Sequence, residues 1–155
     1  MRLTALLFTL AAPFYLACPS AQAQQVDGRS VFNIQCVACH QVDGKGVPGS
    51  FPPLARNRDL FLARDFPARV VLFGMDGTIV ANGQTIQGAM PPLGDVLDDA
   101  EIAAVVNYVR GAFGNAALAP KAMQPLDAAT VAALRQRKDD QVYDYRKQLK
   151  AAAKP

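Results

Sequence analysis

The cysteines and the histidine of this 155-residue chain constrain its fold more than any other feature. Cys36, Cys39 and His40 form the pattern C-x-x-C-H. His40 is the only histidine of the chain, and the third cysteine, Cys18, lies in an N-terminal segment that we expect to be removed. Every thiol and every imidazole of the mature protein therefore falls within one short stretch of sequence.

This spacing is typical of the covalent attachment of a c-type haem. Two thiols separated by two residues on one helical turn can each add to a haem vinyl group, and the next imidazole then lies beneath the iron. A zinc site requires four ligands, and the chain has no second Cys or His pair. A thioredoxin-like pair requires a βαβ context, which the downstream sequence lacks. We therefore predict one haem c bound through Cys36 and Cys39, with His40 as an iron ligand.

A second axial ligand from this chain cannot be a histidine, so the methionines are the candidates. Met90 lies in a proline-rich segment, residues 88–94, and about 50 residues separate it from His40, which is ample to pass around a haem. The prolines that follow Met90 restrict the backbone and help to hold a thioether in place. We predict Met90 as the distal ligand. Met75, at a turn, and Met123, beyond the last core helix, are expected to be packing residues.

The N-terminal residues have the pattern of a secretory signal. Arg2 precedes a mostly apolar stretch, residues 3–16, and Ala-Gln-Ala at 21–23 fits the small-x-small cleavage rule. The apolar stretch is short for a membrane span. We expect a signal peptide of residues 1–23 and a mature protein in the periplasm of a bacterium. The alternative is a lipoprotein signal, in which Cys18 is lipidated and retained.

Apolar periodicity predicts helices over residues 28–36 and 65–73. A third helix should begin after Asp98, where Glu101 stands three residues on and completes a capping box. Residues 78–80, between an Asp-Gly and an Asn-Gly pair, form a short strand-like piece or a loop.

Residues 25–115 resemble class I cytochromes c. Gly28 matches the glycine at which the family's N-terminal helix closely crosses its C-terminal helix, and Tyr108 matches the aromatic residue at that crossing. Pro52 matches the proline whose carbonyl accepts a hydrogen bond from the proximal histidine, and Met90 matches the distal ligand. The resemblance implies an all-α class I cytochrome c fold, with small helices wrapped around one covalently bound haem and His/Met ligation of the iron.

Residues 83–115 are more narrowly similar to periplasmic cytochromes that serve as electron-accepting subunits of bacterial dehydrogenases. The similarity rests on Phe113-Gly114-Asn115, whereas Ile86 stands where those proteins often carry tyrosine. It implies redox protein partners, with a dehydrogenase as donor and an oxidase or another cytochrome as acceptor. Neither nucleic acid nor a membrane span after signal removal is expected. A freely diffusing electron carrier and a haem enzyme or gas sensor with an open axial site are the alternatives.

The C-terminal residues differ in composition from the rest of the chain. We expect a cytochrome domain over residues 24–118 and a basic, partly helical tail over 119–155. From residue 121 there are eight Lys/Arg and four Asp, a net charge of +4, against seven Lys/Arg and nine Asp/Glu, a net −2, in residues 24–120. This asymmetry is compatible with a solvated tail, or with an arm that docks an acidic partner or the body itself.

Overall fold

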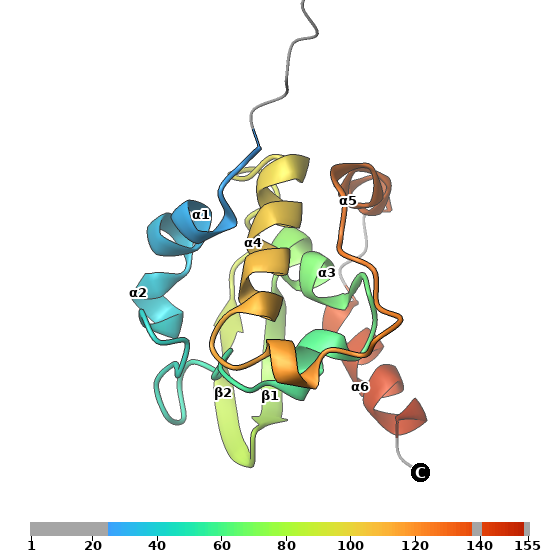
Figure 1. Ribbon diagram of the computed structural model, residues 1–155. Helices are drawn as coiled ribbons and strands as arrows, with labels where there is room; N and C mark the ends of the chain where they lie inside the picture. Colours follow the sequence, from blue (N-terminus) through green and yellow to red (C-terminus); the bar gives the residue numbers. More distant parts are fainter. Residues whose placement is uncertain (1–24, 138–140, 154–155) are drawn as a thin grey trace, which may run out of the picture.

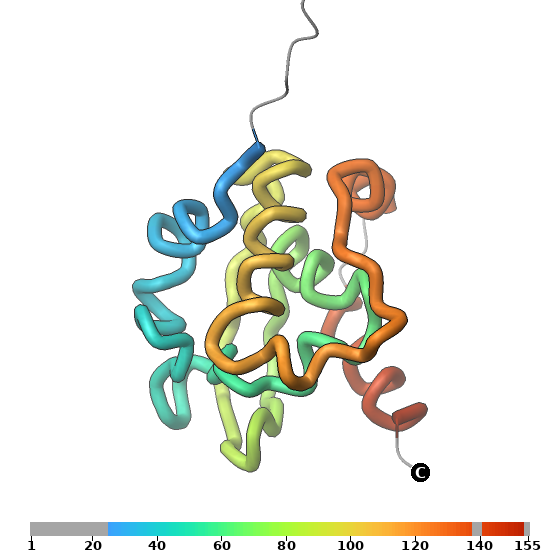
Figure 2. Tube along the Cα trace, viewed as in Figure 1, coloured from blue at the N-terminus to red at the C-terminus, as the bar shows by residue number. Residues whose placement is uncertain are grey.

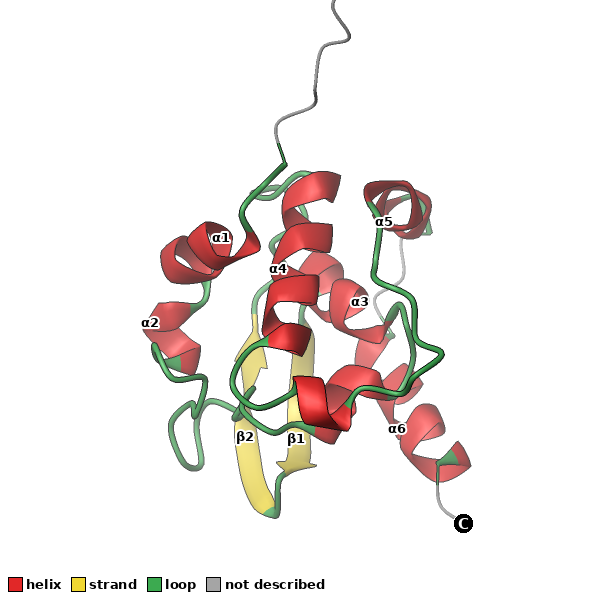
Figure 3. Cartoon of the chain, viewed as in Figure 1, coloured by secondary structure: helices red, strands yellow, loops and turns green. Residues whose placement is uncertain are grey.

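The computed structural model describes residues 25–137 and 141–153 (Figure 1). The predicted signal peptide, including Cys18, lies outside the described residues. Figure 3 shows that helices predominate and that one β-hairpin lies among them. No helix within the described part of the chain is both long and apolar enough to cross a membrane.

Helix α1 (Gly28–Gln35) begins where the sequence predicts. The carboxylate of Asp27 accepts hydrogen bonds from the backbone N–H of Arg29 at 3.0 Å and the hydroxyl of Ser30 at 2.7 Å. The first of these bonds satisfies a backbone N–H that the first helical turn leaves unpaired. A short helix, α2 (Val37–His40), follows at once. Cys36 lies between the two helices, and Cys39 and His40 lie in α2.

Helix α4 (Asp99–Gly111) crosses α1 at a glycine, as predicted. Its capping box is complete, because the N–H of Glu101 donates to Asp98 at 2.8 Å and the N–H of Asp98 donates to Glu101 at 2.9 Å. A Cβ atom on Gly28 would lie 2.1 Å from the carbonyl oxygen of Ala104 and 2.9 Å from the Cβ of Tyr108. Only glycine therefore allows the two helices to approach this closely.

Between α2 and α4 the chain forms helix α3 (Phe66–Phe73) and a β-hairpin. The hairpin corrects the all-α prediction: β1 (Met75–Ala81) pairs antiparallel with β2 (Gln84–Met90), well beyond the short piece expected at 78–80. Asn82 and Gly83 form its turn with positive φ angles of 50° and 76°. This Asn-Gly pair matches the right-handed twist of the flanking strands, which explains the tight connection.

The described residues after 118 pack on the body, which is one of the arrangements that the sequence left open and differs from a solvated tail. Helix α5 (Ala128–Arg135) places Val131 and Leu134 in the same apolar core as α1 and α4, together with Leu126. Val131 is 0% exposed. In Figure 2 the trace returns past α4, so that α5 lies on the opposite side of α4 from α1. The exact boundary near residue 118 stays a prediction.

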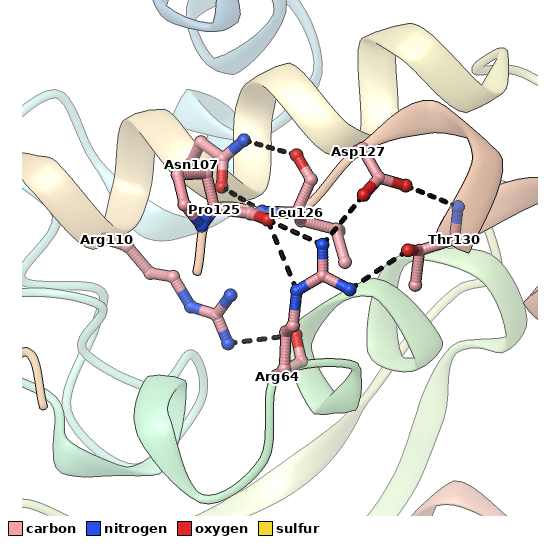
Figure 4. Close-up of polar contacts among 7 residues, drawn as sticks. All are labelled: Arg64, Asn107, Arg110, Pro125, Leu126, Asp127 and Thr130. Carbon is pink, nitrogen blue, oxygen red and sulfur yellow. Dashed lines mark hydrogen bonds and ion pairs between the residues drawn. The ribbon is translucent and has the colours of Figure 1, made fainter. Parts of the chain in front are cut away.

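Figure 4 shows the polar contacts that hold the start of this segment. The guanidinium of Arg64 donates to the carbonyl of Pro125 at 2.7 Å, to the carboxylate of Asp127 at 2.9 Å and to the hydroxyl of Thr130 at 3.0 Å. The side chain of Asn107, on α4, exchanges two hydrogen bonds with the backbone of Leu126, at 2.8 and 2.9 Å. The segment is therefore bound to the body by directional contacts as well as by apolar burial.

The last helix, α6 (Val142–Ala152), packs against α3 and β1. The hydroxyl of Tyr143 donates to the carbonyl of Thr78 in β1 at 2.8 Å. The hydroxyl of Tyr145 donates to the carboxylate of Asp65, immediately before α3, at 2.9 Å. Helix α6 thus joins two elements that lie far from it in the sequence.

Candidate haem site

His40 is held by the residue that the resemblance implied. Its side chain is 7% exposed, and its Nδ1 lies 3.0 Å from the carbonyl oxygen of Pro52. A carbonyl only accepts, so Nδ1 carries the proton and Nε2 keeps its lone pair for a metal ion. Burial lowers the pKa of His40, although its bond to Pro52 acts in the opposite direction. The neutral form that a metal ligand requires is therefore favoured.

The two cysteines lie on the turn that leads into His40. The N–H groups of Cys39 and His40 both donate to the carbonyl of Cys36, at 3.2 and 2.9 Å, which closes one helical turn. Both thiols are free. Burial, and to a smaller extent the charge of Cys39, raise the pKa of Cys36 to about 11, so that this thiol is protonated at neutral pH.

A cavity opens beside this turn, and we call it the central cavity. It contains about 850 Å³ of space free of protein atoms, a figure that includes its opening to solvent. Cys36 and His40 line it at α2, and a smaller side cavity next to it is lined by Cys39 and His40. Most of the remaining wall of the central cavity is apolar: Leu54, Leu60, Phe66, Val70, Val71, Ile79, Val105, Val106 and Val109.

Two methionines line the same cavities as the cysteines and the histidine. Met75 and Met90 are paired residues at the open end of the hairpin, so their side chains lie on one face of it. Both line the central cavity and the side cavity, whereas Met123 lines neither. The sequence interpretation placed Met90 here and missed Met75, because the pairing that brings Met75 to the site depends on the hairpin.

The surroundings of the two methionines differ. Met75 packs against the small apolar cluster of the hairpin, formed by Ile79, Ala81 and Ile86. Met90 is not among the side chains packed against either apolar cluster of the described residues. Apolar neighbours therefore surround the thioether of Met90 less than that of Met75.

The backbone after Met90 is fixed against the end of α3. The N–H of Leu93 donates to the carbonyl of Val71 at 2.8 Å. Gly74 ends α3 with a φ of 73°, and a Cβ atom there would lie 2.5 Å from the carbonyl oxygen of Met90. Met90 is the last residue of β2 rather than part of a free loop, and glycine at position 74 allows the end of α3 to lie close to its backbone.

Polar residues that sequence reasoning missed form one part of the central cavity: Asn57, Asp59 and Arg146. Asn57 and Asp59 belong to the 3₁₀ turn η1 (Arg58–Phe61) and its N-cap, and Arg146 comes from α6. The apolar spacing of Val142, Tyr145 and Leu149 in the sequence indicates an amphipathic helix. Nothing in that spacing indicates that Arg146 reaches the cavity.

The Phe113-Gly114-Asn115 motif has a structural role in this chain. Asn115 is fully buried, and its amide accepts from the N–H of Asn57 at 3.0 Å while it donates to the carbonyls of Leu54 at 2.9 Å and Val109 at 2.8 Å. The ring of Phe113 packs against that of Phe32 at an interplanar angle of 48°, with ring centres 5.1 Å apart. Asn115 therefore ties the cavity wall to the end of α4.

These features define a protein that holds a haem covalently in an apolar cavity. The residues present fit that group, since two free thiols, an imidazole with an available Nε2 and two thioethers line adjoining apolar cavities. The family model described as "Cytochrome C oxidase, cbb3-type, subunit III" matches residues 23–109. The chain belongs to the cytochrome c family, whose members carry covalent haem c with iron and transfer electrons rather than catalyse reactions.

Curated relatives agree with this assignment. Cytochrome c-552 of Thermus thermophilus is 39% identical over 131 residues, which cover 81% of this chain and 98% of the relative. The cytochrome c subunit of the quinone alcohol dehydrogenase of Gluconobacter oxydans is 40% identical over 92 residues, covering 57% of this chain and 18% of the subunit. The fructose dehydrogenase cytochrome subunit of Gluconobacter japonicus is 34% identical, covering 63% of this chain and 21% of the subunit.

Proposed function

We propose that this protein is an exported, periplasmic one-electron carrier in which His40 and Met90 are the axial ligands of the haem iron. One observation supports the proposal. His40 and Met90 line the same apolar cavities although they belong to distant segments of the sequence. When bound, haem c supplies a one-electron couple between ferric and ferrous iron, and a thioether ligand raises its potential.

The protein's own residues prepare this site. The bond to Pro52 orients the imidazole of His40, and the bond from the N–H of Leu93 to the carbonyl of Val71 ties the chain just after Met90 to α3. The apolar wall lowers the local dielectric and excludes water. With both axial positions filled by side chains, no position at the iron remains for a substrate, which favours electron transfer over the alternative of a haem enzyme or gas sensor.

Replacing Met90 with alanine is expected to abolish the weak far-red absorption of sulfur-ligated ferric haem. The same change should allow carbon monoxide to bind the reduced protein, because one axial position becomes open. Absorption spectra of the oxidised and reduced proteins measure both effects. Met75→Ala and Met123→Ala serve as matched controls, since they remove one thioether inside the cavities and one outside them.

The outcome for Met75 decides between the two thioethers that the hairpin brings together. Persistence of the far-red band in Met90→Ala, with its loss in Met75→Ala, would transfer the ligand role to Met75. Carbon monoxide binding by the unaltered protein would favour the open-site alternative instead.

We further propose a periplasmic dehydrogenase as the electron donor. Support comes from relatives that are themselves named as cytochrome subunits of alcohol, fructose and gluconate dehydrogenases. Within the Phe113-Gly114-Asn115 motif, Asn115 is buried and binds the chain's own backbone, so the proposal does not rest on its contact with a partner.

Gentle purification of the tagged protein from its host is expected to recover a dehydrogenase subunit, identified by mass spectrometry. Adding that enzyme's substrate to the purified complex should reduce the haem, seen as sharpening of its visible bands. A parallel purification at high salt provides the control, because salt weakens charge-assisted contacts. Recovery of the cytochrome alone, with equal reduction by unrelated donors, would favour a freely diffusing carrier.

A further inference from the structure

A buried ion cluster forms the polar part of the central cavity. Asp59 is 8% exposed and Arg146 is 6% exposed, and both line the cavity. Nε of Arg146 donates to Oδ2 of Asp59 at 3.0 Å, and Nη2 donates to the same oxygen and to the carbonyl of Val80 at 2.7 Å. Nζ of Lys150 donates to the other oxygen of Asp59 at 3.0 Å. The cluster thus joins η1, β1 and α6.

The charges of this cluster do not cancel. Arg146 and Lys150 contribute two positive charges and Asp59 one negative charge, which leaves a net +1. Lys150 is half exposed and can be solvated, whereas Arg146 is buried. Charge in such a position is costly unless a counter-charge and hydrogen bonds offset the lost hydration.

One donor of Arg146 is not used by the protein. Nη1 makes no hydrogen bond to any residue in 25–137 or 141–153, whereas Nε and Nη2 are both engaged. The other polar group of the wall, Asn57, is satisfied by the carbonyl of Pro53 at 2.7 Å and the N–H of Asp59 at 2.9 Å. Arg146 is therefore the one Lys or Arg among the described residues that line the cavity, and its Nη1 has no protein partner among them.

We propose that Arg146 is a positioning residue for the haem, whose Nη1 donates to a haem carboxylate and whose charge raises the reduction potential. This inference rests on the proposed function, since it requires the haem in the central cavity. The ferric form carries one more positive charge than the ferrous form, so a fixed cation nearby favours the electron-accepting step, in which iron gains one electron from the donor protein. Helix α6 would then be part of the redox site.

Charge variants of the covalently loaded full-length protein provide the test, with reduction potential as the readout. Arg146→Gln should lower the equilibrium constant for reduction by about tenfold, which is about 59 mV for one electron. Asp59→Asn should raise it, because a negative charge is removed from the same wall. Arg146→Lys retains the charge and should shift the potential less than Arg146→Gln.

Lys147→Gln is the matched control. Lys147 is also on α6, but it pairs with Asp144 and is 60% exposed, so its removal should leave the potential nearly unchanged. A purely structural role of Arg146 predicts another pattern. Loosening of α6 would admit water to the cavity and lower the potential in both Arg146→Gln and Asp59→Asn, and such shifts of equal sign would overturn the proposal.

Lys150→Gln covers the case in which Arg146→Gln does not yield folded, loaded protein. It removes one cation from Asp59 while Arg146 stays in place, so the potential should fall, but less than for Arg146→Gln. Opposite shifts in Lys150→Gln and Asp59→Asn support the inference, and equal signs overturn it. Failure of the proposed function is distinct, because the unaltered protein would then show no reversible one-electron reduction.

Discussion

Replacing Cys36 and Cys39 together by serine should leave no haem on the polypeptide after acid denaturation and extraction. Serine is close to cysteine in size, so the α2 turn can still form, but a hydroxyl does not make the thioether bond to a vinyl group. Haem-dependent staining of denatured protein on a gel, together with the intact mass, measures the result. The expected change is complete loss of the covalent adduct.

Met90→Ala is the control for this experiment, because it alters the proposed axial ligation and leaves both thiols in place. That variant should keep its haem through denaturation. If the unaltered protein already releases its haem in acid, the attachment through Cys36 and Cys39 is wrong, whatever the variants show.

Truncation after Pro120 is expected to destabilise the protein severely. It removes Leu126, Val131, Leu134 and Val142, all buried, and exposes the faces of α3 and α4 that they cover. Burying one such side chain contributes about 1.5–3 kcal/mol, so the loss is large beside a total stability of about 5–15 kcal/mol. Denaturant unfolding measures it as a fall in the midpoint concentration.

Two point variants compare a buried position with an exposed one in this segment. Val131→Ala should lower the free energy of unfolding by roughly 1–3 kcal/mol, because it leaves a cavity in the core. Gln148→Ala, on the exposed side of α6, should change it by less than about 0.5 kcal/mol. Equal unfolding midpoints for the full-length and truncated proteins would contradict the packing described above and restore the solvated tail.

The C-terminal segment shows why composition misled the sequence interpretation. Lysine, arginine and alanine dominate residues 121–155, and a segment of that kind is commonly solvated. Leu126, Val131 and Leu134 nevertheless join the main apolar core, and Val142 is buried at the start of α6. The average hydrophobicity of a segment does not indicate whether its few apolar side chains are buried in the folded protein.

The hairpin shows a second limit. The Asn-Gly turn at 82–83 was visible, yet only residues 78–80 were expected to be strand-like. Strand length depends on cross-strand partners, and the polar, glycine-containing sequences of β1 and β2 reveal those partners weakly. The pairing of Met75 with Met90 followed from that length, so the presence of two thioethers at the site could not be foreseen.

Features that depend on contiguous residues were determined by the sequence alone. Cys36, Cys39 and His40 lie on one helical turn, so their spacing specifies their chemistry without knowledge of the fold, and Asp98 and Glu101 cap α4 for the same local reason. The ion cluster of the cavity wall, by contrast, is visible only in the tertiary structure. Arg146 lies 87 residues from Asp59, and such a pair forms only when long-range packing brings α6 against η1 and excludes water from both.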